Sequence, residues 1–170
     1  MPDSPLNLRL ADAAATDVLG DALAQALPAV AGSAVLYLKG ELGAGKTSCA
    51  RSLLRALGAS GLIRSPTFTL VETYRLGALT CVHVDLYRLQ GAAAVDELGL
   101  RDLLNPGCLL LVEWPERGAG ALPPADVELT LGYAEAGREA RLRAHTDFGA
   151  AWLGNLRFNT RIEPYVSNLT

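Results

Sequence analysis

A short glycine-rich segment, GELGAGKT at residues 40–47, constrains this chain more than any other feature. It matches the pattern G-x-x-x-x-G-K-[ST] at every position, and it lies between the apolar run Ala34–Leu38 and an expected helix over Lys46–Leu57. A polyphosphate site needs several backbone N–H groups that point inward together, and glycine adopts the required backbone angles at low cost. The segment therefore predicts a phosphate-binding loop between a buried strand and a helix.

The residues of this loop have separate predicted roles. The N-terminal end of the following helix offers free N–H groups and a positive dipole end to the phosphates. Lys46 can reach the β- and γ-phosphates, and the Thr47 hydroxyl can bind Mg²⁺. The chain carries no NKxD-like guanine motif, which favours ATP. The predicted nucleotide-binding residues of the loop are Glu41, Leu42, Gly43, Ala44, Gly45, Lys46, Thr47 and Ser48.

Two apolar runs end in an acidic residue. CVHVD ends in Asp85, and CLLLVE ends in Glu113. P-loop proteins need a carboxylate at the end of a neighbouring strand, where it acts on Mg²⁺ directly or through water. A carboxylate that closes a buried strand is unfavourable unless it is solvated or paired. We therefore expect at least one of these acids to serve the metal, although either one alone is also compatible with a strand end that faces solvent.

The remaining periodicities are typical of an α/β domain. The expected helices are Asp12–Leu27, Lys46–Leu57, Ala92–Leu104 and Asp147–Leu156. The expected strands are Leu6–Leu10, Ala34–Leu38, Phe68–Arg75, Thr80–Leu86, Cys108–Glu113, Asp126–Tyr133 and Arg138–His145. Residues 1–158 are predicted to form a single P-loop NTPase-like domain. It has a mixed, mainly parallel sheet flanked by helices and a C-terminal antiparallel hairpin. Residues 159–170 are predicted to be a flexible tail.

Composition excludes several classes of protein. Half of the 170 residues are hydrophobic and 19% are charged, which excludes a disordered chain. The net charge of −3 disfavours direct binding of tRNA. The longest apolar run, Cys108–Val112, is far shorter than the ~18 residues of a membrane span. Three scattered cysteines are typical of reduced thiols, so we expect a cytoplasmic protein that does not contact a membrane.

Five motifs occur together in the order typical of one family. They are GELGAGKT, SPTFTLVETY at residues 65–74, HVDLYRL at 83–89, VEWPE at 112–116 and GREAR at 137–141. On these motifs the chain resembles the TsaE family, formerly called YjeE, over residues 10–145. These bacterial P-loop ATPases take part in making threonylcarbamoyladenosine in tRNA. The resemblance implies ATP hydrolysis within a complex with the TsaB and TsaD proteins, and contact with tRNA only through that complex.

The resemblance also assigns roles to single residues. It implies that Glu113 is a Mg²⁺ ligand and that Asp85 is the Walker B-like acid needed for hydrolysis. Thr67 falls in a segment that resembles a switch loop, where a hydroxyl senses the γ-phosphate or the metal. The implied catalytic residues are therefore Lys46, Thr67 and Asp85.

Other residues have two interpretations. Arg138 matches the family arginine that approaches the nucleotide, but it also suits the solvated face of a hairpin. Trp114 follows the metal acid and is expected either near the phosphates or in the core. His83 is expected to pack in the core rather than to act as a base. For Tyr87 and Arg88, the sequence leaves both a partner surface and packing open.

A small-molecule kinase is the alternative function. Many P-loop kinases have about this size, but a kinase lid usually carries several arginines, whereas the segment Trp114–Asp126 offers only Arg117. A nucleotide switch that does not hydrolyse is disfavoured by Asp85 and Glu113. The residues therefore favour an ATPase that is slow in isolation, and the family resemblance implies that TsaB and TsaD activate it.

Overall fold

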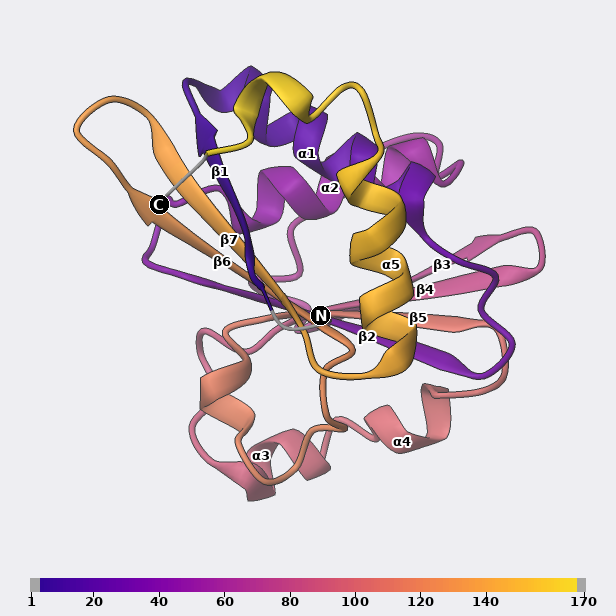
Figure 1. Ribbon diagram of the computed structural model, residues 1–170. Coiled ribbons are helices and arrows are strands. Elements are labelled where there is room, and N and C mark those ends of the chain that lie inside the picture. The colour runs from indigo at the N-terminus through magenta and orange to yellow at the C-terminus, as the bar shows by residue number, and fades with distance from the viewer. Residues whose placement is uncertain (1–3, 168–170) are drawn as a thin grey trace.

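The computed structural model describes residues 4–167, which form a seven-stranded sheet with helices on both faces (Figure 1). The strand order is β1-β7-β6-β2-β5-β4-β3. The strands are β1 (Leu6–Leu10), β2 (Ser33–Gly40), β3 (Val71–Leu76), β4 (Leu79–Asp85), β5 (Cys108–Glu113), β6 (Val127–Tyr133) and β7 (Arg138–Ala144). The helices are α1 (Ala13–Ala26), α2 (Lys46–Ala56), α3 (Ala92–Asp96), α4 (Leu100–Leu103) and α5 (Asp147–Arg157), with 3₁₀ turns η1 (Pro115–Gly118) and η2 (Glu163–Tyr165).

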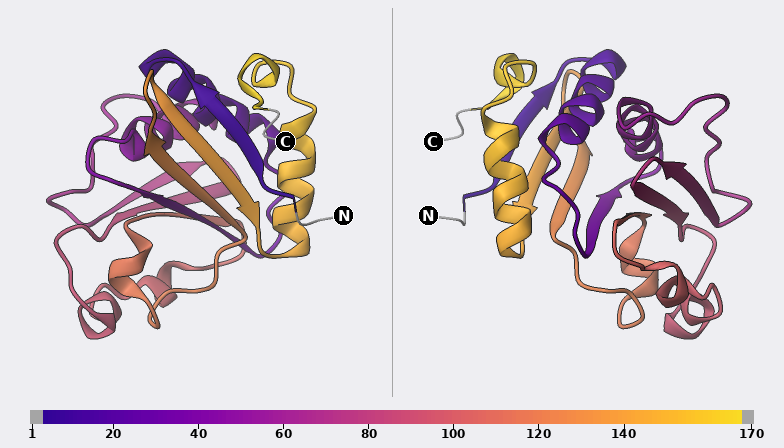
Figure 2. Two further views of the ribbon diagram at one scale, coloured as in Figure 1. Left: turned by 60° about the vertical axis from the view of Figure 1, so that its left-hand side comes forward. Right: turned by 90° about the vertical axis from the view of Figure 1, so that its right-hand side faces the viewer.

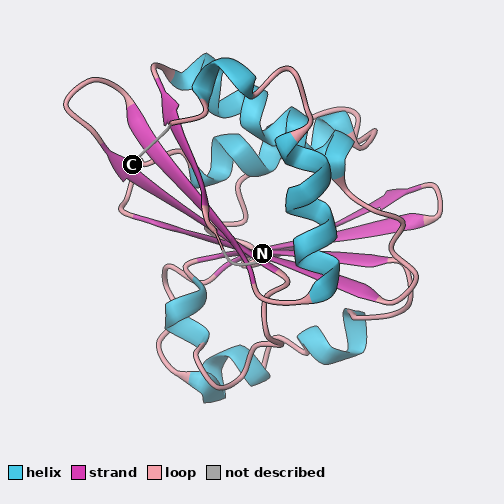
Figure 3. Cartoon of the chain, in the orientation of Figure 1, coloured by secondary structure: helices cyan, strands magenta, loops and turns pink. Residues whose placement is uncertain are grey.

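The sheet is mixed, with its parallel part at the centre (Figure 3). Strands β6, β2, β5 and β4 are parallel neighbours, whereas β3 and β7 run antiparallel to the strands beside them. Strand β1 pairs antiparallel with β7 and so shares the direction of the central four. These pairings confirm the predicted mainly parallel sheet and the C-terminal hairpin, which is formed by β6 and β7.

Apolar cores lie on both faces of the sheet. Helices α1, α2 and α5 cover one face, and α3, α4 and η1 cover part of the other (Figures 1 and 2). Strand β5 is buried along its whole length, as expected for a central parallel strand with both faces covered. Among the described residues, none of the helices is long and apolar enough to cross a bilayer.

The strand register brings the two predicted acids together. Strands β4 and β5 pair so that Asp85 lies opposite Glu113, and β2 pairs with β5 so that Leu38 also lies opposite Glu113. Because these three strands are parallel, their carboxyl ends share one edge of the sheet. The loop that follows β2 begins at this same edge.

Two predicted elements differ from the observed ones. The single helix expected over Ala92–Leu104 is two short helices, because Gly99 adopts a left-handed conformation with φ 65° between α3 and α4. The strand expected from Phe68 begins at Val71 instead. Residues 66–70 form a turn in which the Leu70 N–H donates to the Pro66 carbonyl at 2.7 Å, with Leu70 at φ 67°.

The expected flexible tail packs against the domain over residues 159–167. Ile162 is fully buried and belongs to the core cluster that includes residues of α1, β1 and α5. Val166 forms a bridge to Leu8, and the Ser167 N–H donates to the Asn7 carbonyl at 2.9 Å. The prediction is wrong for this segment because one buried isoleucine and the edge of β1 give it partners. Residues 168–170, also assigned to the tail, lie outside the described residues.

Replacing Ile162 by alanine tests whether this segment is part of the fold. Loss of a fully buried isoleucine side chain should lower the free energy of unfolding by about 2–5 kcal/mol. The control is Phe158→Ala, because Phe158 is 87% exposed and its removal should cost little. Urea unfolding measures both. Equal midpoints for the wild type and Ile162→Ala would contradict the observed packing.

Candidate functional site

The loop between β2 and α2 is shaped by glycines that no other residue can replace without strain. Gly40, Gly43 and Gly45 have φ values of 138°, 77° and 111°. A Cβ atom at Gly40 would also lie only 2.2 Å from the Leu131 carbonyl oxygen. Helix α2 begins after Gly45 with no side-chain cap, so the N–H groups of its first turn are free for a ligand.

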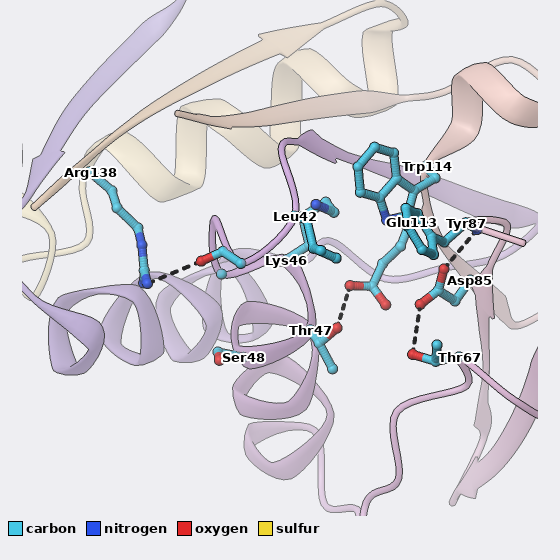
Figure 4. A pocket seen from close by; sticks show the side chains of 12 residues that line it. Leu42, Lys46, Thr47, Ser48, Thr67, Asp85, Tyr87, Glu113, Trp114 and Arg138 are labelled. Atoms are coloured by element: carbon cyan, nitrogen blue, oxygen red, sulfur yellow. Dashed lines mark hydrogen bonds between the residues drawn. The ribbon is translucent and has the colours of Figure 1, made fainter. Parts of the chain in front are cut away.

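A cavity of about 240 Å³ opens over this loop (Figure 4). Most predicted site residues line it: Leu42, Gly43, Gly45, Lys46, Thr47, Ser48, Thr67, Asp85, Glu113 and Arg138. Two predicted residues do not. Ala44 is the fully buried residue of the loop. Glu41 does not line the cavity, but its backbone carbonyl accepts a hydrogen bond from Lys46. Tyr87 and Trp114 complete the wall of the cavity.

Lys46 is held by two backbone carbonyls of its own loop. Its Nζ donates to the carbonyls of Gly40 at 2.6 Å and Glu41 at 2.8 Å, and it lies 4.1 Å from the centre of the Trp114 ring. Burial lowers the pKa of Lys46, while the nearby carboxylates of Glu113 and Asp85 oppose that change. The ammonium group therefore feels the charges of both Glu113 and Asp85, and Trp114 lies beside it, as one of its two expected positions required.

Glu113 joins the sheet to the loop. The Thr47 hydroxyl donates to Oε1 of Glu113 at 2.7 Å, and the carboxylate is almost completely buried (Figure 4). Strand β5 supplies this acid and helix α2 supplies the hydroxyl. The two residues predicted to bind Mg²⁺ are therefore hydrogen bonded to one another.

Asp85 is held by two hydrogen bonds. Its carboxylate accepts one from the Tyr87 backbone N–H at 2.9 Å and one from the Thr67 hydroxyl at 3.2 Å. Burial raises the pKa of Asp85, and the Glu113 charge acts in the same direction, whereas the bonds from Tyr87 and Thr67 lower it. The predicted catalytic Thr67 thus lies beside the predicted catalytic acid.

The segment around Thr67 projects outward. The hydroxyls of Ser65 and Thr67 are 2.6 Å apart, and the next residue, Phe68, is 79% exposed. The Arg88 guanidinium lies 4.2 Å from the centre of the Phe68 ring. Arg88, whose role the sequence left open, therefore contacts this outward segment. Tyr87 packs against Trp114 in the cavity wall, with 5.0 Å between the two ring centres.

Arg138 reaches the loop from the hairpin. Its Nη2 donates to the Gly43 carbonyl at 3.2 Å, and its Nη1 lies 3.5 Å from the hydroxyl of the buried Thr16. The Arg138 side chain therefore lies against the loop rather than on a fully solvated face, and its contact with a nucleotide stays a prediction. Tyr133, which sequence reasoning missed, donates to the Leu42 carbonyl at 2.7 Å. It precedes a hairpin turn and carries no local signal for this contact.

His83 was expected to pack, and it is fully buried. However, its Nε2 lies 3.2 Å from Oε2 of Glu113, so it also contacts a site acid. The sequence did contain a signal that His83 faces the same side of the sheet as Asp85, because residues two apart on a strand share a face. His83 precedes Asp85 by two positions.

The donor atoms at this site suit Mg²⁺. Thr47, Asp85 and Glu113 offer only oxygen atoms, which are the ligands that Mg²⁺ prefers. Across residues 4–167, no group of three or more His, Cys, Asp or Glu side chains is placed to hold a metal ion. In proteins, Mg²⁺ is usually bound through one or two carboxylates together with substrate phosphates, rather than in an all-protein cage.

Comparison with known proteins identifies similar chains. The family model described as "Threonylcarbamoyl adenosine biosynthesis protein TsaE" matches residues 10–141. A protein from Haemophilus influenzae is 41% identical over 115 residues, which cover 68% of this chain and 73% of that protein. A protein from Synechocystis is 42% identical over 121 residues, which cover 69% of this chain and 74% of that protein. Both are described as "tRNA threonylcarbamoyladenosine biosynthesis protein TsaE".

The fold is also similar to a solved structure. A crystal structure of YdiB from Bacillus subtilis superposes with a TM-score of 0.76 at 26% sequence identity. The match covers 91% of this chain and 95% of that one. The similarity therefore includes nearly the whole of both chains.

The electrostatic cost of Asp85 predicts that Asp85→Asn stabilises the ligand-free protein at pH 7. Burial disfavours the charged carboxylate, whereas the amide keeps its shape and remains able to hydrogen bond. The pKa of Asp85 is raised in the folded state, so the stabilisation of Asp85→Asn over the wild type is full above that pKa. It disappears as the pH falls below about 3.9, the pKa of an aspartate in the unfolded chain. Scanning calorimetry at several pH values measures it.

The control for this prediction is Asp96→Asn, which alters an exposed acid at the end of α3. It should leave the melting temperature nearly unchanged. A lower melting temperature for Asp85→Asn than for the wild type at pH 7 would contradict the proposed electrostatic cost.

Proposed function

Because the chain belongs to the TsaE family, we propose that it is a Mg²⁺-dependent ATPase subunit required for threonylcarbamoyladenosine modification of tRNA. In this proposal it hydrolyses ATP in the cytoplasm within a complex with TsaB and TsaD, and it meets tRNA only through that complex. One observation carries the proposal. The phosphate-binding loop and two buried acids from separate strands converge on one cavity.

Nucleotide binding would use groups that are already in place. The free N–H groups at the start of α2 and the backbone of residues 41–45 would hold the phosphates. Lys46 would exchange its bonds to the Gly40 and Glu41 carbonyls for bonds to phosphate oxygens, because charge-assisted hydrogen bonds are stronger than those to neutral carbonyls. Arg138, already at the Gly43 carbonyl, would face the bound nucleotide from the hairpin side.

The two acids would divide the remaining work. Thr47 and Glu113 would hold Mg²⁺, which neutralises charge on the β- and γ-phosphates when bound. Asp85 would orient the attacking water, since its carboxylate lies in the same cavity and is fixed by the Tyr87 N–H. Thr67, bonded to Asp85, would link the state of the segment Ser65–Tyr74 to this acid. Trp114 and Tyr87 would limit access of other water.

The cavity itself supplies little positive charge for the transition state. Within the described part of the chain, Lys46 and Arg138 are the cations that line it. An arginine added by a partner is worth about 10³–10⁵ in rate in related phosphoryl-transfer enzymes. Nearby arginines point elsewhere: Arg117 lies against Tyr87 and Trp114, and Arg88 against Phe68. This shortage supports a requirement for docked partners.

Lys46→Ala should remove nucleotide-dependent stabilisation. At an ATP concentration about 100 times Kd with Mg²⁺, the wild type should gain roughly 2.7 kcal/mol. For a domain of this size that corresponds to roughly 5–10 °C in melting temperature. The variant should lose this gain, because it lacks the cation that meets the phosphates. Thermal shift with and without Mg-ATP is the measurement, with circular dichroism to check folding.

The chain provides a matched control for that experiment. Its only other lysine is Lys39 on β2, which does not line the cavity. The Lys39 Nζ forms an ion pair with Oε2 of Glu128 at 3.4 Å. Lys39→Ala should keep the full shift. If Mg-ATP raises the melting temperature of Lys46→Ala as far as that of Lys39→Ala, the proposed contact of Lys46 with the phosphates is wrong.

A further inference from the structure

The two oxygens of the Glu113 carboxylate have different partners. Oε1 accepts from the Thr47 hydroxyl at 2.7 Å, and Oε2 lies 3.2 Å from Nε2 of His83. His83 and Glu113 have side-chain exposures of 0% and 1%. The carboxylate is therefore held at one end by the strand beside it and is offered at the other end to the phosphate-binding loop.

The second ring nitrogen of His83 identifies the tautomer. Nδ1 is buried and has no hydrogen-bond partner within the described residues. Buried N–H groups are almost always paired, whereas an acceptor without a donor is tolerated somewhat more often. The proton of a neutral His83 therefore lies on Nε2, where it donates to Oε2 of Glu113.

We propose that His83 is a positioning residue for Glu113. Its Nε2–H fixes the rotation of the carboxylate, so that Oε1 stays directed at Thr47. This inference rests on the proposed function, in which Thr47 and Glu113 hold Mg²⁺. Residues that hydrogen bond to a metal ligand orient it, and their loss typically weakens metal affinity 10–100-fold.

Packing alone does not account for a histidine at this position. His83 lies on β4 opposite Leu111 of the buried strand β5, on the face of the sheet where Cys81 and Leu111 belong to the apolar core. An apolar side chain would fill this space without leaving Nδ1 unsatisfied, so the imidazole carries a cost that core packing does not require. The one polar contact that offsets the cost is the bond to Glu113.

The test compares two substitutions of nearly the same shape. His83→Gln keeps an N–H donor that can reach Glu113, whereas His83→Met has none. His145→Gln is the control, because His145 is exposed and lies near Glu128, away from the cavity. Calorimetric titration with ATP, in Mg²⁺ and in EDTA, gives the gain in affinity that Mg²⁺ provides. Electron paramagnetic resonance gives the affinity for Mn²⁺ in the presence of ADP.

We expect His83→Met to lose 10–100-fold in Mg²⁺-dependent affinity and in Mn²⁺ affinity, while its affinity for ATP in EDTA stays at the wild-type value. His83→Gln should recover most of the loss. A folded His83→Met with wild-type metal dependence would overturn the positioning role. A wild type that binds no Mg-ATP would instead overturn the proposed function and this inference with it.

A measurement on the unaltered protein decides the matter if neither variant folds. Nitrogen NMR of histidine-labelled wild type should show His83 with its proton on Nε2 and none on Nδ1. A neutral His83 ring with its proton on Nδ1 and none on Nε2 would lack the donor to Glu113, and this result would overturn the inference.

Discussion

The hydrogen bond between Thr47 and Glu113 joins the phosphate-binding loop to the central sheet, and the geometry of the whole site depends on it. It forms because β5 pairs with both β2 and β4 in a register that ends at Glu113, opposite Leu38 on one side and Asp85 on the other. A shift of one residue would turn the acids to the opposite face of the sheet. The register of β5 against its two neighbours therefore positions the site.

The same arrangement carries an electrostatic cost. Two carboxylates share a poorly solvated edge of the sheet, and the pKa of Asp85 is raised by burial first. Lys46 offsets part of this cost, yet burial lowers its own pKa. Buried charges that conflict in this way are typical of functional sites rather than of structural ones. Under the proposed function, Mg²⁺ would neutralise the carboxylates, and the phosphates would pair with the ammonium group of Lys46 in the same cavity.

Sequence patterns predicted the parts of the site that are encoded locally. The glycines of residues 40–47 reflect backbone angles, and Asp85 and Glu113 stand out because each ends an apolar run. Contacts between distant segments were not predictable in this way. Tyr133 and Leu42 are 91 positions apart, and nothing near Tyr133 indicates a bond to the loop.

The errors in the fold prediction have similar causes. The helix expected over Ala92–Leu104 is divided at Gly99, whose left-handed conformation separates α3 from α4. Ile162 is one apolar residue in a polar segment, so its burial depends on a core formed by distant elements. The sequence indicates which backbone angles and buried runs are needed. It does not indicate which surfaces meet.

Steady-state ATP hydrolysis, measured with increasing amounts of TsaB–TsaD complex, tests most directly whether the cavity is complete. With Lys46 and Arg138 as its lining cations in the described chain, the isolated protein should turn over well below about one ATP per second. Addition of the complex should raise the rate toward the roughly 1–10³ per second of typical enzymes. Fast turnover by the isolated chain, unaffected by TsaB–TsaD but stimulated by a small metabolite, would contradict this account and favour a kinase.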